Sequence, residues 1–444
     1  MGIFDALTTA VSGLQSQSFA LQNISGNIAN SQTVGYKETD TAFQDLVSQA
    51  APGEQTAGGV FASSVASNTV QGTIQNETVP TDMAIDGDGY FVVTQPDGSS
   101  GTQPQFSGVD DYTRRGDFQL DDNGYLVNGA GYYLMGIPVN PATGAPTSTV
   151  PQVLQFNNNF LPAQATAQID YGANLPTTPT SGVLVPADYT DNPLASGTGT
   201  VIGSDVSTFT SQSLNGGSIT TYDSLGNQVN VQLQWAQTSS SASGNTWQLF
   251  YQTDSSATGT QVAWQNTGVS FTFNSSGQLT SPTAQTLTLT NLTVNGDKVG
   301  NVTLSYGSNL TQFANSSGSV QVNSLTQNGF AAGSMQSLSV SQGQVVGSFS
   351  NGQTIPLANI TLATFNGQDS LQPLDGEAYA ATPESGTPLY SATGTVVGSS
   401  LEASNVDIAT QFSQLIVAQQ AYSANARVMT TADQMIQSLL TVIQ

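Results

Sequence analysis

Hydrophobic residues recur every seven positions at both ends of the chain. A period of seven corresponds to about 3.5 residues per turn and is typical of a helical stripe. The pattern therefore predicts one helix in residues 1–30 and another in residues 401–444. The stripe residues are Leu7, Leu14, Leu21 and Ile28 near the N-terminus, and Ile408, Leu415, Tyr422, Met429, Ile436 and Ile443 near the C-terminus.

The C-terminal stripe predicts an unusually long helix. No Gly or Pro occurs from 405 to 444, and Ser404 followed three positions later by Asp407 is typical of a capping box. A helix of about 39 residues would extend roughly 58 Å. An amphipathic helix lying on its own domain is the ordinary alternative. Because this helix would exceed the usual globular length, we expect the two stripes to pair with each other or with other copies.

Between the two ends the hydrophobic period changes to two. Alternating positions of this kind predict strands with one buried face. Turn sequences separate the runs: DSLGN at 223–227, NSSGQ at 274–278 and VNGDK at 294–298. We therefore expect antiparallel β structure here. The alternating hydrophobic residues are Val229, Val231, Leu233 and Trp235; Val269, Phe271 and Phe273; Leu287 and Leu289; Val302, Leu304 and Tyr306; and Ile360 and Leu362.

Shifts in composition divide the β region into two nested domains. A Pro/Thr-rich stretch at 174–182 and a Ser-rich stretch at 315–324 bracket an inserted segment. The predicted fold class is α+β and mainly β, with nested discontinuous β domains and terminal helices that form a coiled-coil-like inner domain. The predicted order is an N-terminal helix at 1–30, an extended connector at 31–71, an inner β domain at 72–174 and 323–400, an inserted outer β domain at 175–322, and a C-terminal helix at 401–444.

Composition excludes many kinds of chemistry. The chain has 444 residues, with 5 Lys and Arg against 29 Asp and Glu, a net charge of −24, and neither Cys nor His. A disulfide, a zinc–thiolate site, a Cys nucleophile and a Ser-His-Asp triad are all excluded. The acidic balance argues against nucleic acid and anionic membranes, since both need clustered basic residues. We expect no cofactor and no enzymatic role.

The hydrophobic residues are too dispersed for membrane insertion. No run of 18 apolar residues occurs, so no transmembrane helix is predicted. The first residues, MGIFDALTTAVSGLQ, contain neither a basic segment nor a continuous apolar stretch. This pattern argues against a Sec-type signal peptide.

Two Asp-rich turns and one basic pair are candidates for binding. DGDG at 86–89 and DDNG at 121–124 suggest calcium loops, but Tyr90 occupies the third ligand position of the first. Asp and Gly are also ordinary turn residues, so we expect no metal site. Arg114 and Arg115 form the only basic pair in the sequence. They could hold a carboxylate of a neighbouring subunit or form ion pairs within the domain, and the second is favoured.

Longer motifs occur at both ends and in the first β segment. The segment 12–37 contains NIAN and GYK, and the segment 401–440 contains SNVD and QQAYSAN. AIDGDGYFVV at 84–93 and YTRRGDFQLDDNGYLVN at 112–128 lie in the predicted inner β domain. These motifs resemble those of the axial proteins of the bacterial flagellum, the rod and hook family.

Two further segments favour the hook members of that family: TYDSLGNQVNVQLQW at 221–235 and the segment 310–365. The resemblance is thin within 140–220 and 236–309. The family commonly has QRAY or QRGY where this chain has QQAY at 419–422, and the missing Arg removes one possible intersubunit ion pair.

The resemblance implies which residues matter. The two helical stripes would be the polymerisation surfaces. The family motif positions are Asn27, Asn30, Gly35, Tyr36, Asn405, Asp407 and Asn425. A neutral lining for a central channel would come from Gln411, Gln414, Gln419, Gln420, Gln434 and Gln437.

The resemblance also implies a structural subunit rather than an enzyme. Such a subunit would polymerise into the curved tubular hook, a universal joint that transmits torque from motor and rod to filament around an export channel. Its partners would be copies of itself, the rod, hook-cap and hook–filament junction proteins, and the flagellar type III export apparatus. It would lie outside the cell, exported without a cleaved signal peptide. The alternatives left open are a distal rod component, a non-flagellar extracellular β-rich adhesin and a glycosidase with paired carboxylates.

Overall fold

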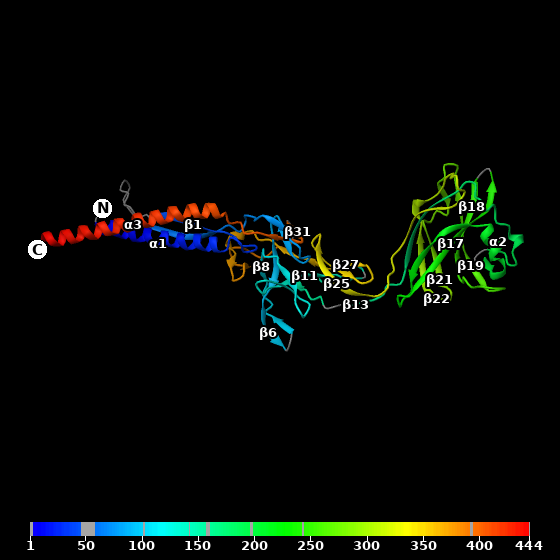
Figure 1. Ribbon diagram of the computed structural model, residues 1–444, viewed down its shortest axis with the longest axis horizontal. Coiled ribbons are helices and arrows are strands. Elements are labelled where there is room, and N and C mark those ends of the chain that lie inside the picture. Colours follow the sequence, from blue (N-terminus) through cyan, green and yellow to red (C-terminus); the bar gives the residue numbers. More distant parts are fainter. Residues whose placement is uncertain are drawn as a thin grey trace. The chain divides into compact units, whose positions relative to one another are not determined.

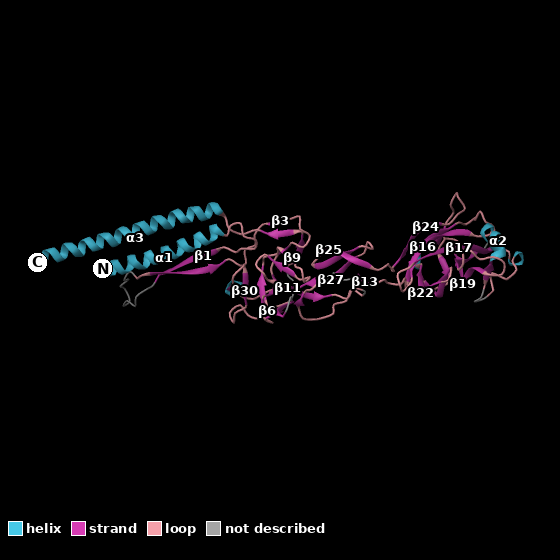
Figure 2. Ribbon diagram, turned by 60° about the horizontal axis from the view of Figure 1, so that its bottom comes forward, coloured by secondary structure: helices cyan, strands magenta, loops and turns pink. Residues whose placement is uncertain are grey.

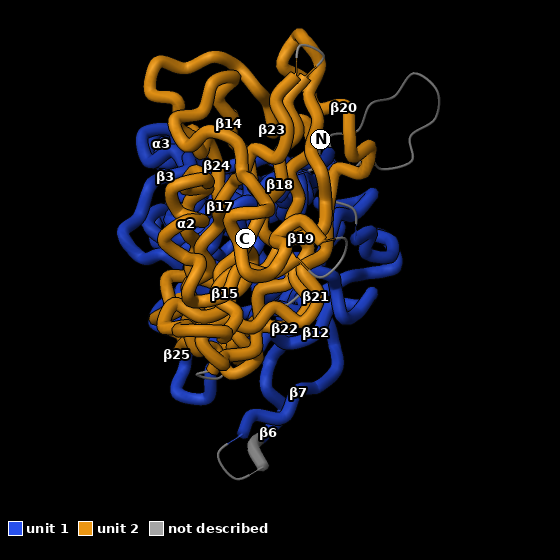
Figure 3. The backbone as a smooth tube through the Cα atoms, turned by 90° about the vertical axis from the view of Figure 1, so that its right-hand side faces the viewer, with its two compact units in different colours: residues 1–159, 336–348, 354–444 blue, residues 160–335, 349–353 orange. Residues whose placement is uncertain are grey.

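Strands are more abundant than helices in the structure, and two long helices lie at the ends of the chain (Figure 1). The computed structural model describes residues 3–45, 58–100, 103–141, 143–156, 160–195, 199–241, 244–390 and 394–443. The predicted fold class, mainly β with terminal helices, is confirmed. The chain divides into two compact units: unit 1 comprises residues 1–159, 336–348 and 354–444, and unit 2 comprises residues 160–335 and 349–353 (Figure 3).

Unit 1 contains both long helices and many short strands. Its elements are α1 (Ile3–Ala29), β1 (Thr39–Asp45), β2 (Val60–Ala66), β3 (Ile74–Asn76), β4 (Met83–Asp86), β5 (Tyr90–Thr94), β6 (Pro96–Ser100), β7 (Gln103–Phe106), β8 (Asp111–Thr113), β9 (Phe118–Leu120), β10 (Leu126–Asn128), β11 (Tyr133–Pro138), β12 (Gln152–Val153), most of β25 (Gly333–Ser341) and β26 (Gln344–Phe349), β27 (Thr354–Ile360), β28 (Leu362–Ala363), β29 (Gln372–Pro373), β30 (Ala378–Ala380), β31 (Thr395–Gly398), β32 (Ser400–Glu402) and α3 (Ile408–Ile443).

The helices α1 and α3 lie side by side and run in opposite directions, so both ends of the chain lie at the same end of unit 1 (Figures 1 and 2). Asn27, near the end of α1, donates a hydrogen bond to Gln411 near the start of α3. Gly13, in the middle of α1, lies against Asn425, further along α3. The two predicted helices therefore pair with each other within one chain.

The C-terminal helix begins slightly later than predicted, at Ile408, and has 36 residues. Asp407 is its cap, because Asp407 Oδ1 accepts the backbone N–H of Thr410 at 2.9 Å. This hydrogen bond lowers the pKa of the Asp407 carboxyl. The capping box assigned to Ser404 was wrong, because α3 begins only at Ile408 and Asn405 N donates to the carbonyl of Tyr36.

The segment predicted as an extended connector contains an antiparallel hairpin instead. Strands β1 and β2 pair from Thr39 with Ala66 to Asp45 with Val60. The hairpin lies along α1, where Ser16 Oγ donates to the carbonyl of Val60 at 3.0 Å. None of its described residues is fully buried, so its sequence lacks the clear alternation that predicts a strand.

Strand β5 lies inside the main sheet of unit 1, between β11 and β8. All five residues of β5 are buried, and the strand pairs with β11, β8 and β28. Its aromatic core includes Tyr90, Tyr112 and Phe365. The DGDG sequence at 86–89 forms the turn into β5, where both glycines have positive φ. Within unit 1 the strand path of this sheet is β25-β26-β27-β11-β5-β8-β30-β29, with β9, β10, β12 and β28 attached beside it.

Unit 2 consists mainly of two sheets. One has the order β15-β19-β18-β17-β16 with β20 beside β19, and the other has the order β21-β22-β14-β23 with β24 beside β14. Its elements are β13 (Phe160–Leu161), β14 (Gln168–Leu175), β15 (Thr200–Ile202), α2 (Val206–Ser211), β16 (Leu214–Tyr222), β17 (Gln228–Ser241), β18 (Gly244–Gln252), β19 (Val262–Phe273), β20 (Leu279–Ser281), β21 (Thr286–Val294), β22 (Asp297–Ser305), β23 (Leu310–Gln312) and β24 (Gln321–Gln327).

The predicted antiparallel pattern holds for most of unit 2 but not for β14. That strand pairs in parallel with β22 and β23 and antiparallel with β24. Parallel neighbours need a long connection, and the chain supplies one because it builds the whole first sheet between β14 and β22. Local alternation cannot show this long-range pairing.

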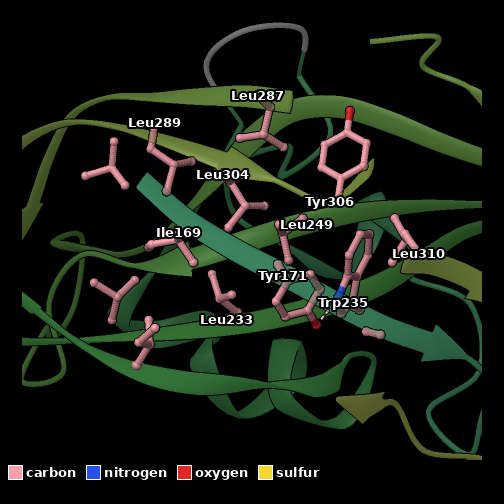
Figure 4. Packing of buried hydrophobic residues seen from close by; sticks show 14 of the residues in the cluster. Ile169, Tyr171, Leu233, Trp235, Leu249, Leu287, Leu289, Leu304, Tyr306 and Leu310 are labelled. Atoms are coloured by element: carbon pink, nitrogen blue, oxygen red, sulfur yellow. Dashed lines mark hydrogen bonds between the residues drawn. The ribbon is translucent and has the colours of Figure 1, made fainter. Parts of the chain in front are cut away.

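The hydrophobic core of unit 2 joins its two sheets (Figure 4). Trp235 Nε1 donates to the Tyr171 hydroxyl at 2.8 Å, and this hydroxyl donates to the carbonyl of Gly216 at 2.9 Å. Phe271 packs edge to face against Trp235 and Tyr306, with ring centroids 5.0 and 5.3 Å away. The alternating positions predicted along β17, β19, β21 and β22 supply most of this core, so the period-two interpretation is confirmed.

The unit boundaries lie outside the predicted limits of 175 and 322. Strand β14 belongs to unit 2, since Ile169 and Tyr171 are both buried in its core. The Pro/Thr-rich stretch at 174–182 therefore lies inside the unit rather than at its border. The Pro and Thr content identifies this stretch as a loop. It does not identify a domain border, because the loop connects two parts of the same core. Among the described residues, no helix combines the length and the apolarity that crossing a bilayer requires.

We expect Phe271→Ala to destabilise unit 2 by about 3–5 kcal/mol, because it removes a fully buried ring between two others. The measurement is urea unfolding of the full chain. Phe160→Ala is the matched control, because Phe160 is 68% exposed, and its effect should stay within about 0.5 kcal/mol. Equal effects of the two variants would contradict this packing.

Candidate assembly surface at the paired terminal helices

Small and polar side chains fill the seam between α1 and α3. A methyl group added at Gly13 would lie 2.8 Å from the side-chain nitrogen of Asn425, so the Asn425 side chain packs directly against α1 there. Side chains this small permit such close packing but bury little apolar surface. The buried helix residues are Ala10, Ala20, Ile24 and Asn27 of α1 and Gln411, Ala418 and Ala432 of α3, together with Ser16 beside the hairpin.

The ten predicted polymerisation residues flank this seam instead of filling it. Half-buried positions are Leu7, Leu14, Leu21, Ile28, Leu415 and Ile436, and exposed positions are Ile408, Tyr422 and Met429. The side chain of Ile443 lies outside the described residues. Two sets of residues therefore repeat every seven positions: the large stripe residues and the small buried residues. The small residues make the contact between the helices within the chain.

Large apolar side chains are exposed along α3. Their exposed fractions range from 40% for Ile408 to 65% for Val417. Exposed apolar residues in such number on one helix are typical of an interaction surface. These residues are spread around the helix outside the seam, and together they are called the apolar face of α3: Ile408, Phe412, Ile416, Val417, Tyr422, Val428, Met429 and Met435.

A groove of about 410 Å³ lies beside this face. Ala20 and Ile24 of α1, Phe43 of the hairpin, and Val417 and Ala418 of α3 are among its lining residues. Three elements of unit 1 thus form one mostly apolar depression next to exposed apolar side chains.

Asn27 connects the two helices and the hairpin through four hydrogen bonds. Its Oδ1 accepts the Tyr36 hydroxyl at 3.1 Å and the backbone N–H of Thr39 at 3.0 Å. Its Nδ2 donates to the carbonyl of Thr39 and to Gln411 Oε1, both at 3.1 Å. Gln411 Nε2 in turn donates to Glu38 Oε1. The assignment of Gln411 to a channel lining was wrong, because this side chain is buried against α1.

Other family motif residues hold the chain around the same point. Asn30 bonds the carbonyl of Gly26 and the Thr33 hydroxyl, which ends α1. Asn405 Oδ1 accepts the backbone N–H of Glu38 at 2.7 Å, directly before α3. With the Asp407 cap and the Gly13–Asn425 contact, the motif positions fix where each helix begins, ends and touches its partner.

Gly35 brings the loop after α1 against a buried charge cluster. Its φ is +73°, and an added methyl group would lie 2.8 Å from the backbone nitrogen of Arg115. Only glycine fits both conditions comfortably. The backbone N–H of Gly35 donates to the carbonyl of Glu402 at 2.8 Å, so the chain reverses next to that residue.

Glu402 forms the centre of the charge cluster and is completely buried. Its Oε1 accepts Lys37 Nζ at 2.5 Å and the backbone N–H of Gly72 at 2.8 Å, and its Oε2 lies 3.3 Å from an Arg114 nitrogen. Lys37 Nζ also donates to the carbonyl of Val70 at 2.6 Å. Three segments far apart in sequence therefore meet at one carboxylate.

The cluster holds two buried cations and one buried anion. Burial lowers the pKa of Lys37, and the adjacent Glu402 charge opposes that shift. The Arg114 guanidinium lies 5.3 Å from the centroid of the Tyr90 ring, where a cation–π contact offsets part of its desolvation. Sequence reasoning missed Lys37 and Glu402 as site residues. The available signal was that Lys37 is one of only five basic residues and ends the GYK motif.

Arg115 binds two carboxylates of its own unit. It contacts both oxygens of Asp117, at 2.8 and 2.9 Å, and Glu377 at 2.9 Å. Both arginines of the basic pair therefore form ion pairs within unit 1, and the favoured alternative is confirmed.

The second Asp-rich turn is held by hydrogen bonds of its own. Asp121 Oδ1 accepts the backbone N–H groups of Asn123 and Tyr125. In the part of the chain that the structure describes, no group of three or more acidic residues is placed to hold a metal ion.

Comparison with known families matches four segments of the chain. Family models described as "Flagella basal body rod protein", "Flagellar hook protein FlgE/F/G D1 domain", "Flagellar basal body protein FlaE D2 domain" and "Flagellar basal body rod FlgEFG protein C-terminal" match residues 7–37, 84–191, 203–330 and 397–442. The flagellar hook protein FlgE of Brucella abortus is 30% identical, with 99% of both chains aligned. The chain belongs to the flagellar hook protein family. This family is structural rather than enzymatic.

A second relative agrees with this assignment. The flagellar hook protein FlgE of Salmonella typhimurium is 31% identical over 98% of this chain and 99% of its own. A crystal structure of the Helicobacter pylori flagellar hook protein FlgE2 aligns with a TM-score of 0.49 and 15% identity, covering 74% of this chain and 100% of that one.

We expect Glu402→Gln to destabilise unit 1 by about 3–5 kcal/mol, because it leaves two buried cations without a counter-ion. Lys37→Met should cost clearly less, since Arg114 and Glu402 then remain as a neutral pair. Thermal unfolding of both variants measures the difference. Glu384→Gln, at an exposed position, is the control. A Lys37 variant less stable than the Glu402 variant would contradict the assignment of Glu402 as the shared partner.

Asp82 gives unit 1 a defined pH dependence. Burial, followed by the nearby charges of Asp117 and Glu77, raises the pKa of Asp82 from 3.8 to about 6. The folded state therefore binds more protons than the unfolded state between about pH 4 and 6, and stability falls as pH rises through that range. Asp82→Asn should raise the melting temperature at pH 7 but not at pH 4. Asp97→Asn, at an exposed position, should raise it at neither.

Proposed function

We propose that this chain is the subunit that polymerises into the curved tubular hook of the bacterial flagellum. Membership of the flagellar hook protein family supports this role, since the relatives with that name align over nearly their full length. The observation that carries the proposal is the exposed apolar face of α3. Burial of such a face between identical copies would drive assembly.

The arrangement of side chains on α3 supports association with other copies. Its small residues pack against α1, and its large residues remain exposed. Each exposed Ile or Val side chain that becomes buried contributes roughly 1.5–3 kcal/mol. The flanking stripe residues are proposed to join these contacts in the polymer. They are Leu7, Leu14, Leu21, Ile28, Ile408, Leu415, Tyr422, Met429, Ile436 and Ile443.

The hook acts as a universal joint, and each unit would contribute differently to it. Helices joined by apolar contacts would transmit torque from motor and rod to filament around an export channel. Unit 2 exposes neutral polar side chains along β21, including Thr286, Thr288 and Thr290. Small polar contacts between such surfaces would exchange readily as the hook bends.

The proposed partners follow from this role. They are further copies of the chain, the rod, hook-cap and hook–filament junction proteins, and the flagellar type III export apparatus, with no nucleic acid and no membrane insertion. The subunit would lie outside the cell and keep its first thirty residues after export. This retention is supported by α1, whose loss would remove half of the helix seam.

A distal rod component is the second candidate, because the models that match both ends of the chain carry rod descriptions. Electron microscopy of the polymer separates the two candidates, since a hook is curved and a rod is straight.

Substituting Asn at both Ile416 and Val428 should raise the critical concentration for polymerisation more than tenfold, because two apolar side chains would no longer gain from burial. Both residues are exposed in the subunit, so its thermal unfolding should not change. Sedimentation of polymer at increasing protein concentration gives the critical concentration.

The matched control is Gln419→Asn with Gln420→Asn, at two exposed polar positions on the same helix. It should polymerise like the parent chain. If the apolar variant also polymerised at the parental concentration, the apolar face of α3 would not be the assembly surface.

A further inference from the structure

We propose that the hydrogen bond between Asn27 and Gln411 fixes the register in which α1 and α3 pair. Asn27 is then a positioning residue, because it determines where along unit 1 the apolar face of α3 is presented. The register itself is a property of the single chain. Only its consequence for assembly rests on the proposed function.

Two contacts define the observed register. Gly13 faces Asn425, and Asn27 bonds Gln411, so fourteen residues separate the contacts on each helix. Midway between them, Ala20 and Ala418 line the same groove. The seam residues thus recur every seven positions on both helices.

This repeat makes the small-residue packing compatible with more than one register. A slide of one heptad would place Ala20 opposite Asn425 and Asn27 opposite Ala418. Most small residues would again meet small residues, and the large apolar side chains outside the seam would stay exposed. The apolar contacts therefore discriminate weakly between the native and the slipped arrangement.

The hydrogen bond between Asn27 and Gln411, in contrast, distinguishes strongly between the native and the slipped register. Asn27 is 2% exposed and all four of its hydrogen-bonding positions are occupied. In the slipped register its amide would face the methyl group of Ala418, and the buried Gln411 oxygen would also lose its donor. Unpaired buried polar groups are costly, and a single buried Asn is known to fix register in helical pairs.

The same contact also ties the register to the hairpin. Asn27 bonds the backbone of Thr39, and Gln411 bonds the side chain of the preceding residue, Glu38. Both helices are therefore positioned against two adjacent residues at the start of β1. A slide of α3 would break its bond to Glu38 as well as its bond to α1.

The chain contains no Cys, so introduced Cys pairs report the register without interference. The seam places Gln17 opposite Ala421, and both line the groove. Gln17→Cys is combined with Ala421→Cys for the native register, and with Val428→Cys or Gln414→Cys for a slide of one heptad in either direction. Mild oxidation of the full chain, followed by gel electrophoresis, measures the intramolecular disulfide in each pair.

In the parent sequence the Gln17–Ala421 pair should cross-link at least about tenfold more than either slipped pair, as expected when slipping leaves a buried polar group unpaired. With Asn27→Ala this preference should shrink by at least about threefold without vanishing, because Asn405 and Glu402 still hold the start of α3 beside the loop after α1. Gln411→Ala should act in the same way. Asn23→Ala is the matched control: it is the same residue type on the same helix, but its amide bonds Thr41 and Ser64 of the hairpin. It should keep the parental preference.

An unchanged preference in the Asn27 and Gln411 variants would overturn the proposal. So would the loss of all three cross-links while unit 2 still melts normally, because Asn27 would then hold the helices together rather than set their register. Failure of the parent chain to form polymer would count against the proposed function alone, since the cross-link ratios do not depend on assembly.

Discussion

The buried carboxylate of Glu402 is the interaction on which unit 1 depends. It lies just before α3, and it binds Lys37 from the loop after α1 and Arg114 from the loop between β8 and β9. The start of one helix, the end of the other and the β sheet are therefore joined at one point. A desolvated carboxylate has few acceptable alternatives to these partners, so the three segments must come together correctly for the unit to fold.

Beyond this point the helices are joined by contacts of a different kind. The seam between α1 and α3 consists of small residues and one saturated amide network around Asn27. The small residues let the two helices pack side by side, and the hydrogen bonds of Asn27 link one particular position on α1 to one on α3. The large apolar side chains take no part in either task, which leaves them available for contacts with other molecules.

The sequence predicts the fold class well because its two periods are strong and local. The alternation along β17, from Val229 to Trp235, corresponds directly to the buried face of that strand. The hairpin β1–β2 could not be predicted, since none of its described residues is fully buried. The parallel pairing of β14 also left no local signal. At the site, the heptad located the helices but not their contact, because small and polar residues form that contact and the large stripe residues flank it.

The two sides of α3 impose opposite limits on sequence change. On the seam side, even one added carbon at the facing Gly13 position meets the side chain of Asn425, so enlargement displaces that contact while polarity is tolerated. On the outer side, side chains such as Ile416 and Val417 have open space and tolerate enlargement, whereas loss of apolarity removes what a neighbour could recognise. In natural variants of this helix, we therefore expect seam positions to keep a small side-chain volume and outer positions to stay hydrophobic. The two kinds of position should alternate every three to four residues.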